Sequence, residues 1–367
     1  MTTLLVELAE AESPSSDAAS QEAVRSILTG RLEGLGLRVE RVEGVEGCDH
    51  LRAGVEGAGG THQLLLGHFD TVWPVGTISR MPVGIRDGKL YGPGVFDMKG
   101  GIVQMLFALE AISDLGIEMP CPPLVLLNCD EEIGSPDSRR HVEALAAGAT
   151  RAFVMEPSYG PRGRLKTGRK GVGRFTLKVT GVASHAGLDP AAGASAILEV
   201  SHQVERLFEL NDAERGVTVN VGTIDGGMGA NIVAPEASAE IEARVPTSAD
   251  AEAVEAAIRG LEPSADRVEL RVEGGFRRPP LEATSRNRRL WRSAVSAARE
   301  LGIEIGEAQV GGASDGNFAS MLTATLDGLG AVGDGAHAEH EHVVLERMPE
   351  RAALLACLLC GPVEGEG

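Results

Sequence analysis

Side chains that can bind a metal ion follow three short apolar runs in the first half of this 367-residue chain. Each run has the length and composition of a buried strand. In chain order the runs lead to His68 and Asp70, to Glu131 and Glu132, and to Glu156. Because ligands of open α/β sheets bind outside the carboxyl ends of the strands, we expect these side chains to gather at one edge of a sheet.

Two glycine-rich loops supply further candidates. Asp97 lies in the loop 92–101, and His337 lies in the loop 333–337. A single Asp after a strand is most often a turn residue or a helix cap, and Asp70 or Asp97 taken alone fits that interpretation. The combined set points to chemistry, because oxygen and imidazole ligands without cysteine favour a hydrolytic divalent-metal site over a structural zinc site.

The candidates divide into a site for two metal ions. Each ion would have one imidazole, one terminal carboxylate and a share of a bridging carboxylate. His68 and Glu156 would complete one ion, Glu132 and His337 the other, with Asp97 as the bridge. Two divalent ions outweigh three carboxylates by one positive charge, which favours a bridging hydroxide and polarises a carbonyl oxygen.

Two carboxylates next to this set are expected to assist it. Asp70 comes two residues after His68, so on a strand end it lies on the same side and can hold the other ring nitrogen. Glu131 adjoins the proposed ligand Glu132 but should point away from it. Glu131 is therefore free to deprotonate the attacking water and to pass the proton to a leaving amine.

Alternating strands and helices would position these residues. The apolar runs are 64–66, 124–127 and 153–155, and apolar residues at helical spacing occur over 18–35, 99–115 and 137–147. This order predicts an α/β fold with a mostly parallel sheet and helices on both faces.

The pattern changes near Gly168. Four segments then alternate between apolar and polar residues, with helices expected over 193–210 and 249–261, which favours a small sheet with helices on one face. Helical spacing returns over 285–301 and 347–360. We therefore predict a small inserted α+β domain, residues 169–278, and a catalytic domain made of residues 1–168 and 279–367.

Composition narrows the possible partners. Lys and Arg number 34 against 53 Asp and Glu, a net charge of −19, which argues against nucleic acid and against anionic membrane surfaces. No apolar run approaches the roughly 18–20 residues of a membrane span. The first residues lack a basic leader and do not resemble a signal peptide.

Cysteine usage favours a reducing compartment. The five cysteines are odd in number and widely scattered, so we predict no disulfide framework and a cytoplasmic location. Cys357 and Cys360 form a CxxC inside an apolar run. One such pair cannot make a four-ligand zinc site, and buried helix positions are favoured over redox or metal use.

Four sequence blocks together resemble a known superfamily. They are Gly67–Val72, Tyr91–Gly101, Asp130–Ser135 and Glu156-Pro157, and they look like the signature blocks of the co-catalytic zinc exopeptidases and deacylases. That superfamily includes glutamate carboxypeptidase, aminoacylase, acetylornithine deacetylase and succinyl-diaminopimelate desuccinylase. The Gly-Pro-Gly of the second block, and Gly-Ser after Asp-Glu-Glu, are most similar to the glutamate carboxypeptidase branch, since desuccinylases usually have Gly-Arg-Gly.

The resemblance implies a role for each candidate. It implies two Zn²⁺ ions, with Co²⁺ or Mn²⁺ possible because the same ligands accept them. It implies that Asp97 is the bridge, Glu131 the general base and Asp70 the orienting carboxylate, and that the Asp97–Met98 peptide bond is often cis. The implied metal ligands are His68, Asp97, Glu132, Glu156 and His337.

The resemblance also implies roles within the insert, as a lid and a homodimerisation domain. His185 would help to hold the scissile carbonyl, often from the partner subunit, and Asn231 would contact substrate. Arg244, and by a weaker match Arg278, would bind a substrate carboxylate through two hydrogen bonds. The alternatives are a packing histidine and solvated arginines.

The remaining histidines are expected to be structural. His340 and His342 crowd close to His337, but His337 has the family context and the flexible glycine-rich loop, so the other two are assigned to the surface. Histidines without a partner pattern are His50, His62, His141 and His202. Asp315, in a loop that resembles one near the substrate, is assigned no catalytic role.

The sequence thus favours a metal-dependent hydrolase that cleaves an amide bond next to a free carboxylate, releasing a C-terminal Glu or a similar residue. The alternative within this class is deacylation of an N-acyl amino acid. A non-catalytic metal-binding scaffold is disfavoured because Glu131 is present. A two-metal phosphoesterase fits the ligands but not the order of the blocks.

Overall fold

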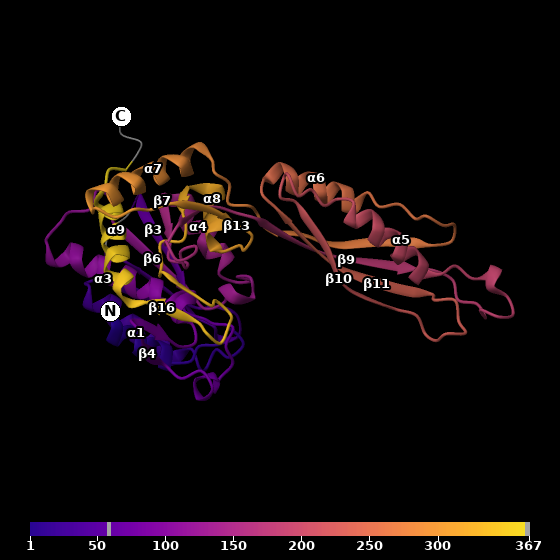
Figure 1. Ribbon diagram of the computed structural model, residues 1–367, viewed down its shortest axis with the longest axis horizontal. Coiled ribbons are helices and arrows are strands. Elements are labelled where there is room, and N and C mark those ends of the chain that lie inside the picture. The colour runs from indigo at the N-terminus through magenta and orange to yellow at the C-terminus, as the bar shows by residue number, and fades with distance from the viewer. Residues whose placement is uncertain (57–59, 364–367) are drawn as a thin grey trace. The chain divides into compact units, whose positions relative to one another are not determined.

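The computed structural model describes residues 1–56 and 60–363, and these form two compact units (Figure 1). Unit 1 contains Met1–Thr167, Ala283–Gln309 and the described part of Ser314–Gly367. Unit 2 contains Gly168–Glu282 and Val310–Ala313. The predicted insert, residues 169–278, falls within unit 2.

A six-stranded mixed sheet forms the centre of unit 1. Its strand order is β1-β2-β6-β3-β7-β14, and β6, β3, β7 and β14 run parallel to one another. The strands are β1 (Arg38–Val42), β2 (His50–Gly54), β3 (His62–His68), β6 (Pro123–Asn128), β7 (Ala149–Val154) and β14 (Ala324–Leu326). The antiparallel strands β1 and β2 complete one side of the sheet.

Helices cover both faces of this sheet because successive side chains of a buried strand point to opposite faces. Leu64 and Leu66 of β3 pack with α4 (Arg139–Gly148) and α8 (Asp315–Leu322), whereas Leu65 belongs to the larger core on the other face. The helices of the larger core are α1 (Thr2–Glu10), α2 (Glu22–Gly34), α3 (Gly100–Asp114), α7 (Ser285–Glu300) and α9 (Met348–Cys360).

There are two smaller sheets besides. One lies in unit 1 and has the order β15-β16-β5-β4, and the other pairs β8 with β13, two strands that each begin in unit 1 and end in unit 2. Their strands are β4 (Gly84–Arg86), β5 (Lys89–Tyr91), β8 (Leu165–Arg169), β13 (Glu307–Val310), β15 (Gly333–Asp334) and β16 (His342–Val344). His342 in β16 is buried with its ring centroid 5.1 Å from that of Tyr91, so its predicted surface position is wrong. Cross-strand pairing with β5 places this ring inside.

Unit 2 is a four-stranded antiparallel sheet with two helices on one face. The order is β10-β11-β9-β12, and Phe175, Leu177 and Val179 alternate inward from β9 onto the helices. The elements are β9 (Gly171–Thr180), α5 (Ala196–Phe208), β10 (Thr218–Gly226), β11 (Glu236–Val245), α6 (Ser248–Arg259) and β12 (Glu269–Arg278). The predicted fold class, a mostly parallel sheet flanked by helices with a small α+β insert, is thus confirmed.

One cysteine prediction is wrong. Cys48 precedes β2 and Cys129 follows β6, and the two form a disulfide with their Cα atoms 6.0 Å apart. β2 and β6 are antiparallel neighbours, so the start of one lies beside the end of the other, which a sequence separation of 81 conceals. Cys357 and Cys360 are free, partly buried thiols of α9, as the helix assignment predicted.

Within residues 1–56 and 60–363, none of the helices combines the length and the apolar character that crossing a bilayer requires.

Candidate active site and metal centre

Three of the predicted ligands from separate segments converge in unit 1. His68 ends β3, Glu156 follows the neighbouring parallel strand β7, and Asp97 lies in the turn η3 (Val95–Lys99) that leads into α3. His68 Nε2 is 3.5 Å from Asp97 Oδ1 and 3.5 Å from Glu156 Oε1. These three residues form one group that could hold a metal ion.

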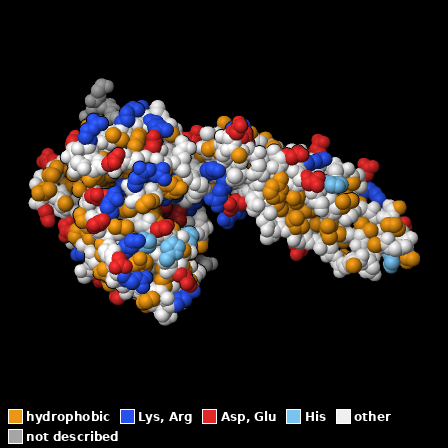
Figure 2. Space-filling view, viewed as in Figure 1, with side chains coloured by type: hydrophobic (Ala, Val, Ile, Leu, Met, Phe, Trp, Pro, Cys, Tyr) orange, Lys and Arg blue, Asp and Glu red, His pale blue; other side chains and the backbone are white. Residues whose placement is uncertain are grey.

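A second group shares Asp97 with the first. Glu132 lies in the short helix η4 (Glu131–Ile133) after β6, and His337 lies in the loop after β15. His337 Nε2 is 3.0 Å from Glu132 Oε2 and 3.5 Å from Asp97 Oδ2. Asp97 therefore directs one oxygen to each group, as a bridging carboxylate would. In Figure 2, histidine side chains gather beside acidic ones on the visible face of unit 1.

Both groups fit a divalent metal ion. His68 Nε2 and Asp97 Oδ1 are buried and have no hydrogen-bond partner among the described residues. Buried polar atoms are nearly always paired, so two that face each other mark a place for a ligand. Their spacing is close to the roughly 3.3 Å that separates tetrahedral ligands at ~2.0 Å from zinc.

Electrostatics show how strongly this cluster attracts cations. Burial alone would lower the pKa of His68, but the carboxylates of Asp70, Asp97 and Glu156 outweigh burial and hold that pKa well above its ordinary value. Asp97 and Glu132 raise the pKa of His337 to about 10. Burial opposes ionisation of Asp97, yet the two imidazoles keep the pKa of this carboxyl well below its usual range. Imidazolium charges thus balance the carboxylates when no other cation is bound.

Asp70 connects the two halves of the cluster. Its buried carboxylate has Oδ1 at 3.3 Å from His68 Nδ1, on the side of the ring away from the ligand nitrogen. The same carboxylate accepts the backbone N–H groups of Glu131 and Glu132, at 3.3 and 3.1 Å, and the Ser15 hydroxyl at 2.6 Å. Asp70 therefore orients the His68 ring and fixes the turn that carries the acidic pair.

Glu341 is a functional candidate that the sequence reasoning missed. It is buried and accepts hydrogen bonds from the backbone N–H groups of Gly94, Phe96 and Asp97 at 2.9–3.1 Å, and from the Trp73 indole at 2.9 Å. Burial raises the pKa of Glu341 to about 7, although these hydrogen bonds favour its ionised form. Glu341 thus positions the loop of Asp97, and its place four residues after His337 was the only sequence signal.

Glycines allow the Asp97 loop to approach the strand ends. A Cβ on Gly101 would lie 1.9 Å from the Met155 carbonyl oxygen, so only glycine lets α3 begin against the strand end that leads to Glu156. Gly94 has a φ of +71°. The peptide bond between Asp97 and Met98 is cis, as the resemblance implied.

Asp315 supports the segment that carries Glu131. It accepts hydrogen bonds from Asn128, at the end of β6, and from Ser135 Oγ at 2.5 Å. Asp130 Oδ2 accepts the N–H groups of Asp137 and Ser138 at 2.9 and 3.1 Å. Asp315 thus anchors Asn128 and Ser135, on either side of Glu131 and Glu132, and Asp130 anchors the start of α4.

The four candidates of the insert all belong to unit 2. His185 is exposed, and its Nδ1 accepts the N–H groups of Gly187 and Leu188 at 3.1 Å each, which leaves the ring proton on Nε2. The backbone carbonyl of Asn231 accepts from Ala186 N–H at 2.9 Å. Arg244 on β11 donates to Glu242 and to the Gly311 carbonyl, and Arg278 is buried at the end of β12.

This site and fold are those of a known class of metal-dependent hydrolases. The family model described as Peptidase family M20/M25/M40 matches residues 64–360, and the chain belongs to this family. It is therefore a metallopeptidase or amidohydrolase by family.

Individual relatives differ in their chemistry. The chain is 30% identical to Carboxypeptidase G2 of Pseudomonas sp. (strain RS-16) over 368 residues, covering 97% of this chain and 87% of that protein. It is 31% identical to succinyl-diaminopimelate desuccinylase of Xanthomonas oryzae pv. oryzae (strain MAFF 311018), covering 91% and 92%. Among solved structures, aminopeptidase PepT from Bacillus cereus ATCC 10987 has the same fold, with a TM-score of 0.80, 21% identity and coverage of 98% and 96%.

Proposed function

We propose that this chain is a two-metal exopeptidase that hydrolyses an amide bond next to a free carboxylate and releases a C-terminal Glu or a similar residue. One observation carries the proposal: Asp97 is shared by two ligand groups, and the carboxylate Glu131 directly precedes Glu132 of the second group. The similarity to Carboxypeptidase G2 over nearly the whole chain supports the same substrate class.

The metal-binding assignment follows from the two groups. His68, Asp97 and Glu156 would hold one ion, and Asp97, Glu132 and His337 would hold the other. Zinc suits this mixture of imidazole and carboxylate, and Co²⁺ or Mn²⁺ suits it as well. When bound, the two ions supply Lewis acidity that polarises the scissile carbonyl and acidifies a water molecule.

Glu131 is the proposed general base. The Asp70 carboxylate holds the N–H groups of Glu131 and Glu132 and so fixes the backbone of the turn. Successive side chains of a short helix diverge, so we assign Glu132 to the ligand group and Glu131 to proton transfer. Glu131 would take a proton from the attacking water and pass it to the leaving amine, a step worth about 10²–10⁴ in rate.

The insert would supply substrate recognition. His185 carries its proton on the exposed Nε2, so it can donate a hydrogen bond to a carbonyl oxygen without changing its charge. Arg244 has Nε and Nη1 engaged, and Nη2 offers donors for a substrate carboxylate. Asn231 and Arg278 complete the proposed contacts, with Arg278 the weakest because it is buried.

Unit 2 is also the proposed lid and homodimerisation domain. β10 is an edge strand of its sheet, and an edge strand is a template for pairing with a second copy. Exposed apolar side chains accompany this edge and α5, as Figure 2 shows for the visible face; they include Ile197, Leu198, Phe208, Ile224 and Met228. Light scattering of the full chain and of a Met228→Lys variant tests the dimer, which the variant should weaken.

N-acyl amino acid deacylation is the second candidate function. The 31% identity to a desuccinylase over 91% of the chain favours it. The two candidates share the metal centre and Glu131 and differ in which part of the substrate the insert recognises.

A cytoplasmic location also stays a proposal. The free thiols Cys121, Cys357 and Cys360 support it, whereas the Cys48–Cys129 disulfide is a bond that cytosolic reductants would open. Thiol titration of protein prepared from the cytosol under anaerobic conditions tests the location: five thiols would support it, and the three thiols of the structure would argue against it.

The experiment that tests the function is turnover by the zinc-loaded protein on a substrate panel. The panel contains N-acyl-glutamates, folate-type glutamates, N-acetylornithine, N-succinyl-diaminopimelate and short dipeptides. Release of Glu supports the exopeptidase proposal. Turnover confined to acetyl or succinyl substrates supports the deacylase candidate, and no turnover with two ions bound contradicts both.

A further inference from the structure

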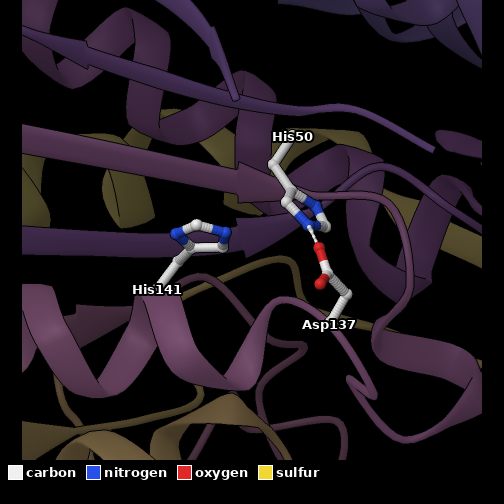
Figure 3. Close-up of side chains that lie close together, drawn as sticks. All are labelled: His50, Asp137 and His141. Carbon is white, nitrogen blue, oxygen red and sulfur yellow. Dashed lines mark hydrogen bonds and ion pairs between the residues drawn. The ribbon is translucent and has the colours of Figure 1, made fainter. Parts of the chain in front are cut away.

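A second set of potential metal ligands lies in unit 1 and shares no residue with the candidate metal centre. His50 begins β2, Asp137 precedes α4, and His141 lies on the first turn of α4. Figure 3 shows the Asp137 carboxylate pointing at the His50 ring, and the His141 ring beside them with a nitrogen on the side of His50. His50 Nε2 is 3.0 Å from Asp137 Oδ2, and one ligand atom from each residue lies within 4.8 Å of the others.

The three side chains become more exposed to solvent in the order His50, Asp137, His141. His50 is fully buried, Asp137 is 9% exposed, and His141 is partly exposed. An ion could therefore enter past His141 and meet ligands that the fold already holds. The ring centroids of the two histidines are 5.6 Å apart with an interplanar angle of 61°, an edge-on arrangement rather than a stacked one.

We propose that His50, Asp137 and His141 form a third metal site, which takes one divalent transition-metal ion of the zinc class and leaves its remaining coordination position to water. Two imidazoles and one carboxylate are a ligand set that Zn²⁺ uses in proteins with an open fourth position. His141 Nε2 accepts a hydrogen bond from Arg140 Nε at 3.3 Å, so this ring nitrogen carries a lone pair that a metal ion could take instead.

Binding at His50 requires a change of tautomer. Its Nε2 now faces the Asp137 carboxylate, and its Nδ1 accepts the Cys129 backbone N–H at 3.4 Å. When Nε2 binds the ion, the ring proton moves to Nδ1, which gives up this hydrogen bond and faces Cys129 Sγ, 3.2 Å away.

Arg140 competes with the ion for this site. Its Nη2 is 2.8 Å from Asp137 Oδ1, and its Nε is 3.3 Å from His141 Nε2. The Arg140 side chain is 64% exposed, so it can swing into solvent when an ion arrives. Removing this guanidinium should strengthen metal binding, because the Asp137 carboxylate then has no competing cation. The gain should be modest, since an exposed ion pair of this kind is weak.

The third site adjoins the segment that carries the proposed base. The Asp137 N–H donates to Asp130 Oδ2 at 2.9 Å, and Asp130 directly precedes Glu131. An ion bound to Asp137 would tie β2 and α4 to this segment. We therefore assign the site a structural and positioning role rather than a catalytic one.

The test compares bound zinc in the full-length wild-type chain and in the His141→Ala variant. Both proteins are stripped with a chelator, loaded with excess Zn²⁺, gel-filtered and analysed for zinc per chain. His141 is partly exposed on α4, so its removal should leave the fold intact, which circular dichroism verifies. The wild type should hold one zinc ion per chain more than His141→Ala, however many ions the other centre binds.

Two further variants make the result specific. His202→Ala removes an exposed histidine of α5 in unit 2 and should match the wild type. Arg140→Ala should retain the additional ion and bind it about two- to fivefold more tightly in chelator competition. Equal zinc content in the wild type and His141→Ala would overturn the proposal, as would a loss of the ion on removal of Arg140. Because the readout is a difference in zinc content, the outcome is independent of the proposed enzymatic function.

Discussion

Replacing Glu341 by glutamine should loosen the Asp97 loop and weaken metal binding, although the substitution removes none of the candidate metal ligands. Four donors now point at the Glu341 carboxylate, two to each oxygen. Glutamine keeps one oxygen and replaces the other by an NH₂ group, so two donors lose their acceptor. Each unsatisfied buried donor costs about 1–3 kcal/mol, or about 2–6 kcal/mol for the pair.

Glutamine is neutral, so the substitution also removes the cost of burying the Glu341 charge, and this offsets part of the lost hydrogen bonding. The pKa of Glu341 is raised to about 7, which shows that burial already disfavours its ionised form. We therefore expect the low end of the range, about 2–3 kcal/mol. For a unit of this size that lowers Tm by roughly 4–12 °C. Displacement of Asp97 should also weaken metal affinity about 10- to 100-fold, as for other outer-shell partners.

Differential scanning calorimetry and chelator competition measure the two effects. Glu339→Gln is the matched control, because Glu339 is two residues away in the same loop, has a side chain that is 74% exposed, and pairs with Arg80. It should change stability by less than about 0.5 kcal/mol. If Glu341→Gln behaved like Glu339→Gln in both assays, the positioning role of Glu341 would be refuted.

Three other outcomes follow from the site. Metal affinity should rise with pH between pH 6 and 8, because His68 and His337, whose pKa is raised to about 10, must lose protons to bind a cation. The logarithm of the affinity should rise by about one unit per pH unit for each proton displaced. Calorimetry in buffers of different ionisation enthalpy measures the number of protons released. A flat profile would show that these imidazoles are not ligands. His185→Ala should lower kcat and leave bound zinc per chain unchanged, and a loss of zinc would contradict its assignment to substrate. Arg244→Ala should raise KM for substrates with a free carboxylate much more than for their amides, and equal effects on both would remove it as the carboxylate contact.

The sequence pointed to the candidate metal ligands because each of them lies at a recognisable point of the chain, and the structure places them in two adjoining groups. His68, Glu132 and Glu156 follow apolar runs that become β3, β6 and β7, and parallel strands bring their carboxyl ends to one edge. The helices over 99–115, 285–301 and 347–360 also correspond closely to α3, α7 and α9, since their apolar periodicity is strong.

Features that depend on contacts between distant segments were not predictable in this way. The hydrogen bonds of Glu341 join residues more than 240 positions apart, and no local pattern marks them. The Cys48–Cys129 disulfide arises from the antiparallel pairing of β2 with β6, and β2 was not predicted at all. His50 and His141 were assigned as structural because their partner, Asp137, becomes apparent only in space.

The most direct test of the central claim is the Glu131→Gln variant of the zinc-loaded protein. On the best substrate of the panel, turnover should fall about 10²–10⁴-fold while bound zinc per chain equals that of the wild type. Glu143→Gln changes a partly exposed carboxylate of α4 that pairs with Arg139; it is the control and should retain both activity and zinc. Full activity in Glu131→Gln, or a loss of activity that only follows a loss of zinc, would contradict the account.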